Sequence, residues 1–189
     1  MTTEVLESLL EGGAETPSID YKQSCPWDIT CFVKDILAMS NVQDGGIIII
    51  GVKEDNEGGF LREGVSDENK DTYVIDIMKD QVSGFADPYV GFEVDFPVDS
   101  DYKNYVVIRV FPFEELPVIC KKEGADVHAG RIYYRNRNRR VESAPVSNSY
   151  DMRSIIQLAA VKMMRGFLDL GLSADATDMQ RFEEELQGL

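Results

Sequence analysis

Residues 44–54 read Asp-Gly-Gly-Ile-Ile-Ile-Ile-Gly-Val-Lys-Glu, and this stretch decides the fold. The apolar run over 47–52 shows no polar alternation, which is typical of a strand that is covered on both faces. We therefore predict a central strand there rather than an edge strand. Turn formation and close backbone packing explain the glycines at 45, 46 and 51, because no phosphate-binding glycine motif surrounds them.

Helical and extended patterns alternate on both sides of this strand. Ahead of it we predict a helix over 3–11, a strand over 18–23 and a helix that begins after the cap residue Asp28. After it we predict strands over 60–62, 90–98, 102–111, 117–120 and 131–140. We also predict helices over 68–84, 149–170 and 175–186. This order predicts an α+β fold, a mixed β-sheet flanked by helices with a C-terminal helical extension. Residues 1–147 are expected to form the domain, and 148–189 the extension.

Composition excludes several classes of protein. The 189 residues, 43% hydrophobic, suffice for a core without disulfides, and no apolar run approaches the roughly 20 residues of a membrane helix. No secretory signal is visible, so we expect a cytoplasmic location and no membrane partner. Three cysteines without a paired motif and a lone His128 argue against an ordinary zinc site and against a catalytic triad. The net charge of −15 opposes nucleic-acid binding unless a local basic patch or metal ions offset it.

Acidic residues near the ends of two predicted strands form the first candidate site. Glu15 lies just before the strand over 18–23, Asp20 and Lys22 lie on one face of that strand, and Glu54 follows the central strand. If the two strands pair, Glu15, Asp20 and Glu54 could share a Mg²⁺ or Mn²⁺ ion, and Lys22 could stabilise charge on a phosphate. The alternative is a solvated acidic rim, which is common in a chain with 34 acids.

Basic residues gather in one segment and form the second candidate site. Its candidate nucleic-acid-binding residues are Arg131, Tyr133, Arg135, Arg137, Arg139 and Arg140. In an extended segment the odd-numbered members share one face, where arginines would hold phosphates and the tyrosine could stack on a base. The alternative is that the arginines pair with the plentiful carboxylates of the chain itself.

Three stretches together resemble the Schlafen AlbA-type domain family. They are Glu15 with Ile19-Asp20-Tyr21-Lys22-Gln23-Ser24, then Ile36-Leu37-Ala38-Met39-Ser40-Asn41, and Gly45–Glu54; Leu116-Pro117-Val118 and Tyr133-Tyr134-Arg135 match later strands of the family. The resemblance covers about 15–145. It implies an α+β domain associated with nucleic acid, and some animal members are metal-dependent endoribonucleases with three carboxylates. Carried across, these fall on Glu15, Asp20 and Glu54, and the family's lysine falls on Lys22.

The resemblance leaves the activity open. Many microbial members are described only as DNA-binding or ATP-binding proteins, and this chain has Arg137 and Arg140 where the family usually has glycine and threonine. Our leading hypothesis is a nucleic-acid-binding domain that cleaves RNA or DNA with Mg²⁺ or Mn²⁺. The alternatives are a non-enzymatic regulatory or protein-interaction module and an ATP-binding protein. The apolar stripe of helix 149–170 either caps its own sheet or forms a homodimer interface.

Overall fold

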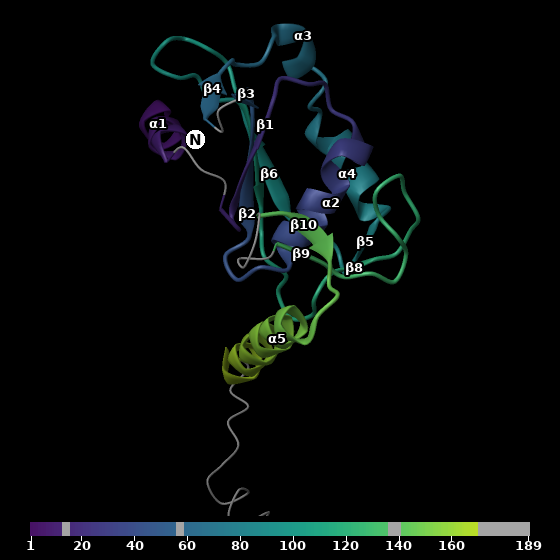
Figure 1. The fold of residues 1–189 in the computed structure, drawn as a ribbon. Helices are drawn as coiled ribbons and strands as arrows, with labels where there is room; N and C mark the ends of the chain where they lie inside the picture. Colours follow the sequence, from purple (N-terminus) through teal and green to yellow (C-terminus); the bar gives the residue numbers. More distant parts are fainter. Residues whose placement is uncertain (13–15, 56–58, 136–140, 170–189) are drawn as a thin grey trace, which may run out of the picture.

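The computed structural model describes residues 1–12, 16–55, 59–135 and 141–169 (Figure 1). The helices are α1 (Thr3–Glu11), α2 (Ile29–Ser40), α3 (Asp67–Lys70), α4 (Ile75–Ser83) and α5 (Ser149–Asp169). The strands are β1 (Ile19–Lys22), β2 (Gly46–Ile50), β3 (Val52–Glu54), β4 (Phe60–Arg62), β5 (Ala86–Asp87), β6 (Phe92–Asp95), β7 (Val106–Val110), β8 (Ile119–Cys120), β9 (Tyr133–Arg135) and β10 (Ser143–Pro145). Within these ranges, no helix has the length and apolar character that a membrane crossing requires.

A four-stranded sheet with the order β1-β2-β7-β6 forms the centre of the fold. Strands β1 and β2 run parallel, with Asp20 opposite Ile48, whereas β2–β7 and β7–β6 are antiparallel. The sheet is therefore mixed, and the predicted α+β class is confirmed. Because β2 lies between β1 and β7, the prediction of a central position for this strand is also confirmed.

The isoleucine run of β2 serves two hydrophobic layers. Ile48 and Ile50 point to the layer formed with α2 and α4, which lie on one side of the sheet (Figure 1). Ile49 points to the other layer, where Leu6 and Leu10 of α1 cover the sheet. Alternate side chains of a strand face opposite sides, so a strand with a layer on each side must be apolar throughout. This explains the sequence pattern on which the fold prediction depends.

Two predicted elements are divided in the structure. The strand predicted over 47–52 ends at Ile50, because Gly51 has φ +111° and turns the chain into β3. A Cβ at Gly51 would lie 2.9 Å from the Tyr105 ring and 3.0 Å from the Gly64 backbone, so only glycine fits. The helix predicted over 68–84 was wrong as one element. It breaks between α3 and α4, where Tyr73 turns inward and its hydroxyl donates to the Cys25 carbonyl at 2.9 Å.

The later strands form small pairs beside the main sheet. Strand β9 pairs with β10, a strand that we did not predict from the sequence. The strand predicted over 117–120 is shorter in the structure, where it forms β8 and pairs with β5. Helix α5 agrees with the predicted helix and packs through the buried Ile155. Residues 136–140 and the helix predicted over 175–186 lie outside the described residues.

Candidate functional site

Four charged side chains meet between β1 and α2. Asp20 and Lys22 occupy alternate positions of β1, so both face α2, where Asp35 joins them. Lys22 Nζ lies 3.0 Å from Asp20 Oδ2 and 2.7 Å from Asp35 Oδ2. Arg135 reaches in from β9, and its Nη1 lies 2.9 Å from Asp20 Oδ1 and 3.7 Å from Asp35 Oδ1. Two cations therefore balance two carboxylates.

The charged side chains of this cluster are largely buried, and they hold parts of the fold together. Arg135 is 1% exposed, and its Nη2 also donates to the Thr16 and Ile19 carbonyls at 3.5 and 3.4 Å. Burial alone would lower the pKa of Lys22, but the carboxylates of Asp35 and Asp20 outweigh it, so the pKa is raised and the ammonium stays charged. The cluster thus joins β1, α2 and β9 through compensated charges.

The structure does not unite the predicted acidic residues among those it describes. Asp20 faces α2, whereas Glu54 is exposed on β3, where Val52, two residues earlier and on the same strand face, packs in the α1 layer on the other side of the sheet. Glu15 lies outside the described residues. Within the described ranges, no three acidic, histidine or cysteine side chains gather so that they could hold a metal ion. Since Arg135 and Lys22 already neutralise Asp20, these residues do not fit a divalent cation.

The predicted arginine stripe is divided between the core and regions outside the described residues. Tyr133 and Arg135 share one face of β9, as predicted, but that face points inward and both side chains are buried, which corrects the expectation of an exposed stripe there. The Tyr133 hydroxyl accepts from His128 N at 2.9 Å. Arg131 is exposed. Arg137, Arg139 and Arg140 lie outside the described residues, in the connection between β9 and β10.

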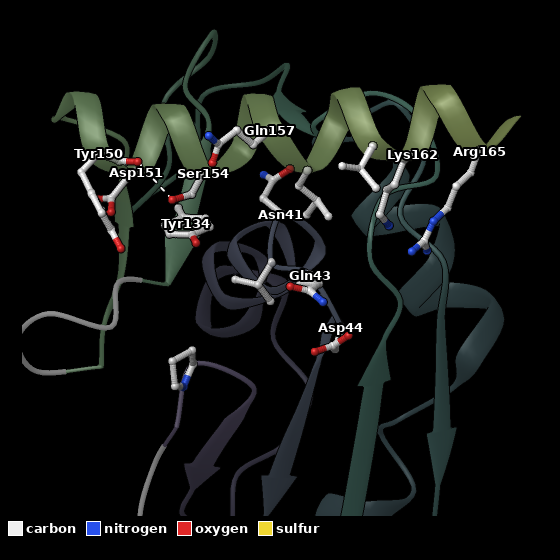
Figure 2. Close-up of a pocket in the computed structure, with 14 residues that line it drawn as sticks. Asn41, Gln43, Asp44, Tyr134, Tyr150, Asp151, Ser154, Gln157, Lys162 and Arg165 are labelled. Atoms are coloured by element: carbon white, nitrogen blue, oxygen red, sulfur yellow. Dashed lines mark hydrogen bonds between the residues drawn. The ribbon is translucent and has the colours of Figure 1, made fainter. Parts of the chain in front are cut away.

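A polar groove runs beneath α5 and has a volume of about 600 Å³. We call it the α5 groove. It is lined by Pro17, Asn41, Val42, Gln43, Asp44, Tyr134, Tyr150, Asp151, Ser154, Gln157, Leu158, Val161, Lys162 and Arg165. Figure 2 shows the two tyrosines at one end of the helix and the two cations at the other, with Gln43 and Asp44 below. The groove therefore has an aromatic end and a basic end.

The basic end of the α5 groove holds two neighbouring cations. Lys162 and Arg165 come from the same side of α5, and neither forms an ion pair with another described residue. Burial and the neighbouring Arg165 lower the pKa of Lys162, although Asp44 and Glu114 oppose this. The Lys162 ammonium donates to the Phe113 carbonyl and lies 4.8 Å from the centre of the Phe113 ring. An anion entering here would relieve the repulsion between the two cations.

Asn41 fixes the position of one wall of the α5 groove. Its side chain is fully buried at the end of α2, and its Nδ2 donates to the carbonyls of Leu37, Val118 and Tyr133 at 2.9–3.1 Å. Its Oδ1 accepts from Val118 N at 2.8 Å. One side chain thus connects α2 with the segments that lead into β8 and β9. The groove wall formed by β9 is held to the core by these bonds.

Sequence reasoning missed the α5 groove. It interpreted the helix over 149–170 as an apolar surface and placed no function on Lys162, Arg165, Tyr134 or Tyr150. A signal was present, because two cations three residues apart share one helix face, and this is unusual in a chain of net charge −15. Nothing in the sequence places Tyr134 beside that face, since β9 and α5 meet only through the tertiary fold.

The fold and its surface define an α+β domain with a mixed sheet and a polar groove under its last described helix. Residues 15–144 match the Schlafen, AlbA_2 family. The match covers more than half of the chain, so the chain belongs to this family, and the resemblance seen in the sequence is confirmed. None of the curated proteins matches the chain.

Two solved structures are similar to the chain at low identity. The DIP2311 protein from Corynebacterium diphtheriae is 16% identical, with a TM-score of 0.49 over 79% of this chain and 27% of that protein. The N-terminal domain of a RecG-related protein from Nitrosomonas europaea is 20% identical, with a TM-score of 0.49 over 78% of this chain and 95% of that domain. The chain thus spans about a quarter of the DIP2311 protein.

Proposed function

We propose that this domain binds single-stranded nucleic acid in the α5 groove. The observation that carries the proposal is the pairing of an aromatic end with a basic end in one groove. Tyr150, with 65% of its surface exposed, and the half-buried Tyr134 offer rings on which bases can stack. Lys162 and Arg165 offer positive charge without a competing ion pair from the described residues, which suits phosphate.

The dimensions of the groove suit a short stretch of single strand. Arg165 lies eleven positions after Ser154 on α5, which corresponds to roughly 16 Å along the helix. The volume of about 600 Å³ lies within the range of sites that hold small organic ligands. Stacking on the tyrosines does not depend on base identity, so we expect little sequence preference.

The charge of the chain sets the conditions for this binding. The overall charge of −15 repels phosphate at long range, and Asp44 lies in the groove itself. Three further arginines, Arg137, Arg139 and Arg140, follow Tyr134 in the sequence. We expect binding to depend on these local cations, and therefore to weaken steeply with added salt.

The proposal is for binding, with cleavage as a separate hypothesis. A metal-dependent nuclease would need Glu15, Asp20 and Glu54 to share Mg²⁺ or Mn²⁺, and the described members of this set do not fit the ion. Binding without cleavage also agrees with the alternative of a non-enzymatic module. The sequence contains no phosphate-binding loop motif, so it gives no support to the alternative of an ATP-binding protein.

Fluorescence anisotropy with labelled oligo-dT, oligo-rU and a DNA duplex tests the proposal. We expect the single strands to bind more tightly than the duplex, with an affinity that falls as salt rises. The double variant Lys162→Met/Arg165→Met and the variant Tyr150→Ala should each weaken binding about tenfold. Lys53→Met on β3 and Tyr102→Ala, 89% exposed in the turn before β7, are matched controls that should bind normally.

Two outcomes would contradict the binding proposal. One is unchanged affinity in both groove variants, and the other is an affinity that does not respond to salt. Incubation of the same oligonucleotides and of tRNA with Mg²⁺ or Mn²⁺ tests the cleavage hypothesis separately. Cleavage that is lost in both Asp20→Asn and Glu54→Gln, while both variants stay folded, would revive the three-carboxylate site.

A further inference from the structure

A second, more apolar groove lies between the loop that precedes β6 and the loop that follows β7. The loops are residues 88–91, after β5, and residues 111–116, after β7. Its volume is about 460 Å³, and Ser40 and Val118 complete its lining. We call it the loop groove. It shares no lining residue with the α5 groove, although Lys162 of that groove donates to the carbonyl of Phe113, which lines the loop groove.

The apolar walls of the loop groove are exposed and preformed. Tyr89, Phe111 and Leu116 are 55%, 39% and 57% exposed, although all three are large apolar or aromatic side chains. The backbone N–H of Phe111 donates to the Gly91 carbonyl at 2.9 Å, which ties the two loops together. A Cβ at Gly91 would lie 3.2 Å from the Phe111 ring, so glycine permits the close approach of that ring. Several exposed apolar side chains around one cavity are typical of a binding surface.

Carboxylates stand on the rim of the same groove. Glu114 and Glu115 are exposed, and neither forms an ion pair with a described residue. Their charge disfavours nucleic acid as the occupant. It also disfavours residues 170–189 of this chain, which carry five acids and one arginine. A ligand that matches the groove combines an apolar centre with basic ends.

We propose that the loop groove binds a short basic segment of a partner protein. Leucine or proline side chains of that segment would enter the cavity between Tyr89, Phe111 and Leu116. Lysine or arginine side chains at its ends would reach Glu114 and Glu115. Aromatic-lined grooves of this kind hold extended, proline-containing peptides, because such peptides lose little conformational entropy on binding.

The experiment measures the affinity of three labelled peptides for the whole chain by fluorescence anisotropy. The first, Arg-Leu-Pro-Pro-Leu-Pro-Arg, has the proposed chemistry. The second, Glu-Leu-Pro-Pro-Leu-Pro-Glu, reverses the charge, and the third, Arg-Ser-Gly-Ser-Gly-Ser-Arg, removes the apolar centre. We expect the first peptide to bind at least about tenfold more tightly than either control, since burial of one leucine side chain alone can supply that factor.

Variants locate the binding on the chain. Leu116→Ala and Tyr89→Ala should each weaken the first peptide about tenfold, and Glu114→Gln/Glu115→Gln should weaken it and reduce its salt dependence. Leu61→Ala, at an equally exposed leucine on β4, should bind normally. The proposal is overturned if the third peptide, which lacks the apolar centre, binds as tightly as the first, if no peptide binds, or if Leu116→Ala does not weaken binding of the first peptide. Self-association of the chain that Leu116→Ala abolishes would also overturn it, in favour of a second copy as occupant.

Discussion

Replacement of Arg135 by alanine should destabilise the domain by about 3 kcal/mol. The loss of its charge-assisted hydrogen bond to Asp20 at 2.9 Å is worth about 1.5–3 kcal/mol. The change also leaves two buried carboxylates with one cation, and breaking a buried pair from one side costs about 3–5 kcal/mol. Lys22, 3.0 Å from Asp20 and 2.7 Å from Asp35, remains as a partial counter-ion, so the lower end of this range applies.

Urea unfolding followed by circular dichroism measures this change. The double variant Asp20→Asn/Arg135→Met removes both charges, and we expect it to be less destabilised than the sum of the single variants. Arg131→Ala, an exposed arginine of the same segment, is the matched control and should change the stability little. A loss below about 1 kcal/mol in Arg135→Ala, or simple additivity in the double variant, would refute the reasoning that the cluster is a coupled structural unit.

Three further predictions concern other parts of the molecule. Hydrogen bonds from Ser100 N and the Arg62 guanidinium lower the pKa of Glu7 to about 2, so the stability that Glu7 contributes is present above the unfolded pKa of 4.5 and is lost as the pH falls through the folded value. The melting temperature of Glu7→Gln should therefore lie below that of the wild type near pH 6 and converge with it towards pH 2. A difference that stays constant with pH would contradict this. Gly51→Ala should cost about 2–4 kcal/mol in urea unfolding, because positive φ and the Tyr105 ring leave no room for Cβ, and a loss under about 1 kcal/mol would exclude this strain. Sedimentation velocity should show a dimer that Ile156→Ser or Met164→Ser converts to monomer, since both side chains are more than half exposed on α5; a wild-type chain that stays monomeric at all concentrations would remove the homodimer hypothesis.

Local patterns predicted the main elements of the fold. The apolar residues of 47–50 specify a strand between two layers, and Asp28 specifies the start of α2, where its carboxylate accepts from Thr30 N at 2.9 Å. The breaks at Gly51 and Tyr73 were harder to predict. Each depends on a side chain or backbone segment that is distant in sequence, such as Gly64 behind Gly51. Residue propensities carry no information about such contacts.

The candidate site was predictable only in part. Alternation along β1 correctly placed Asp20 and Lys22 on one face. It could not show that Arg135, 115 residues away, would occupy that face and neutralise Asp20. The α5 groove likewise depends on the meeting of β9 and α5, and the loop groove on two loops joined through Gly91. In each case the decisive information is the tertiary arrangement.

The Asn41 amide has a consequence for how a ligand would be received. Its bonds to Val118 and Tyr133 fasten one wall of the α5 groove to the end of α2, where Asn41 itself is fully buried. Backbone amides around that wall should exchange slowly with deuterium even in the empty protein, whereas those of the outer helix exchange faster. Nucleic-acid strands of different shape would then be accommodated by displacement of α5, while the groove wall held by Asn41 keeps its position.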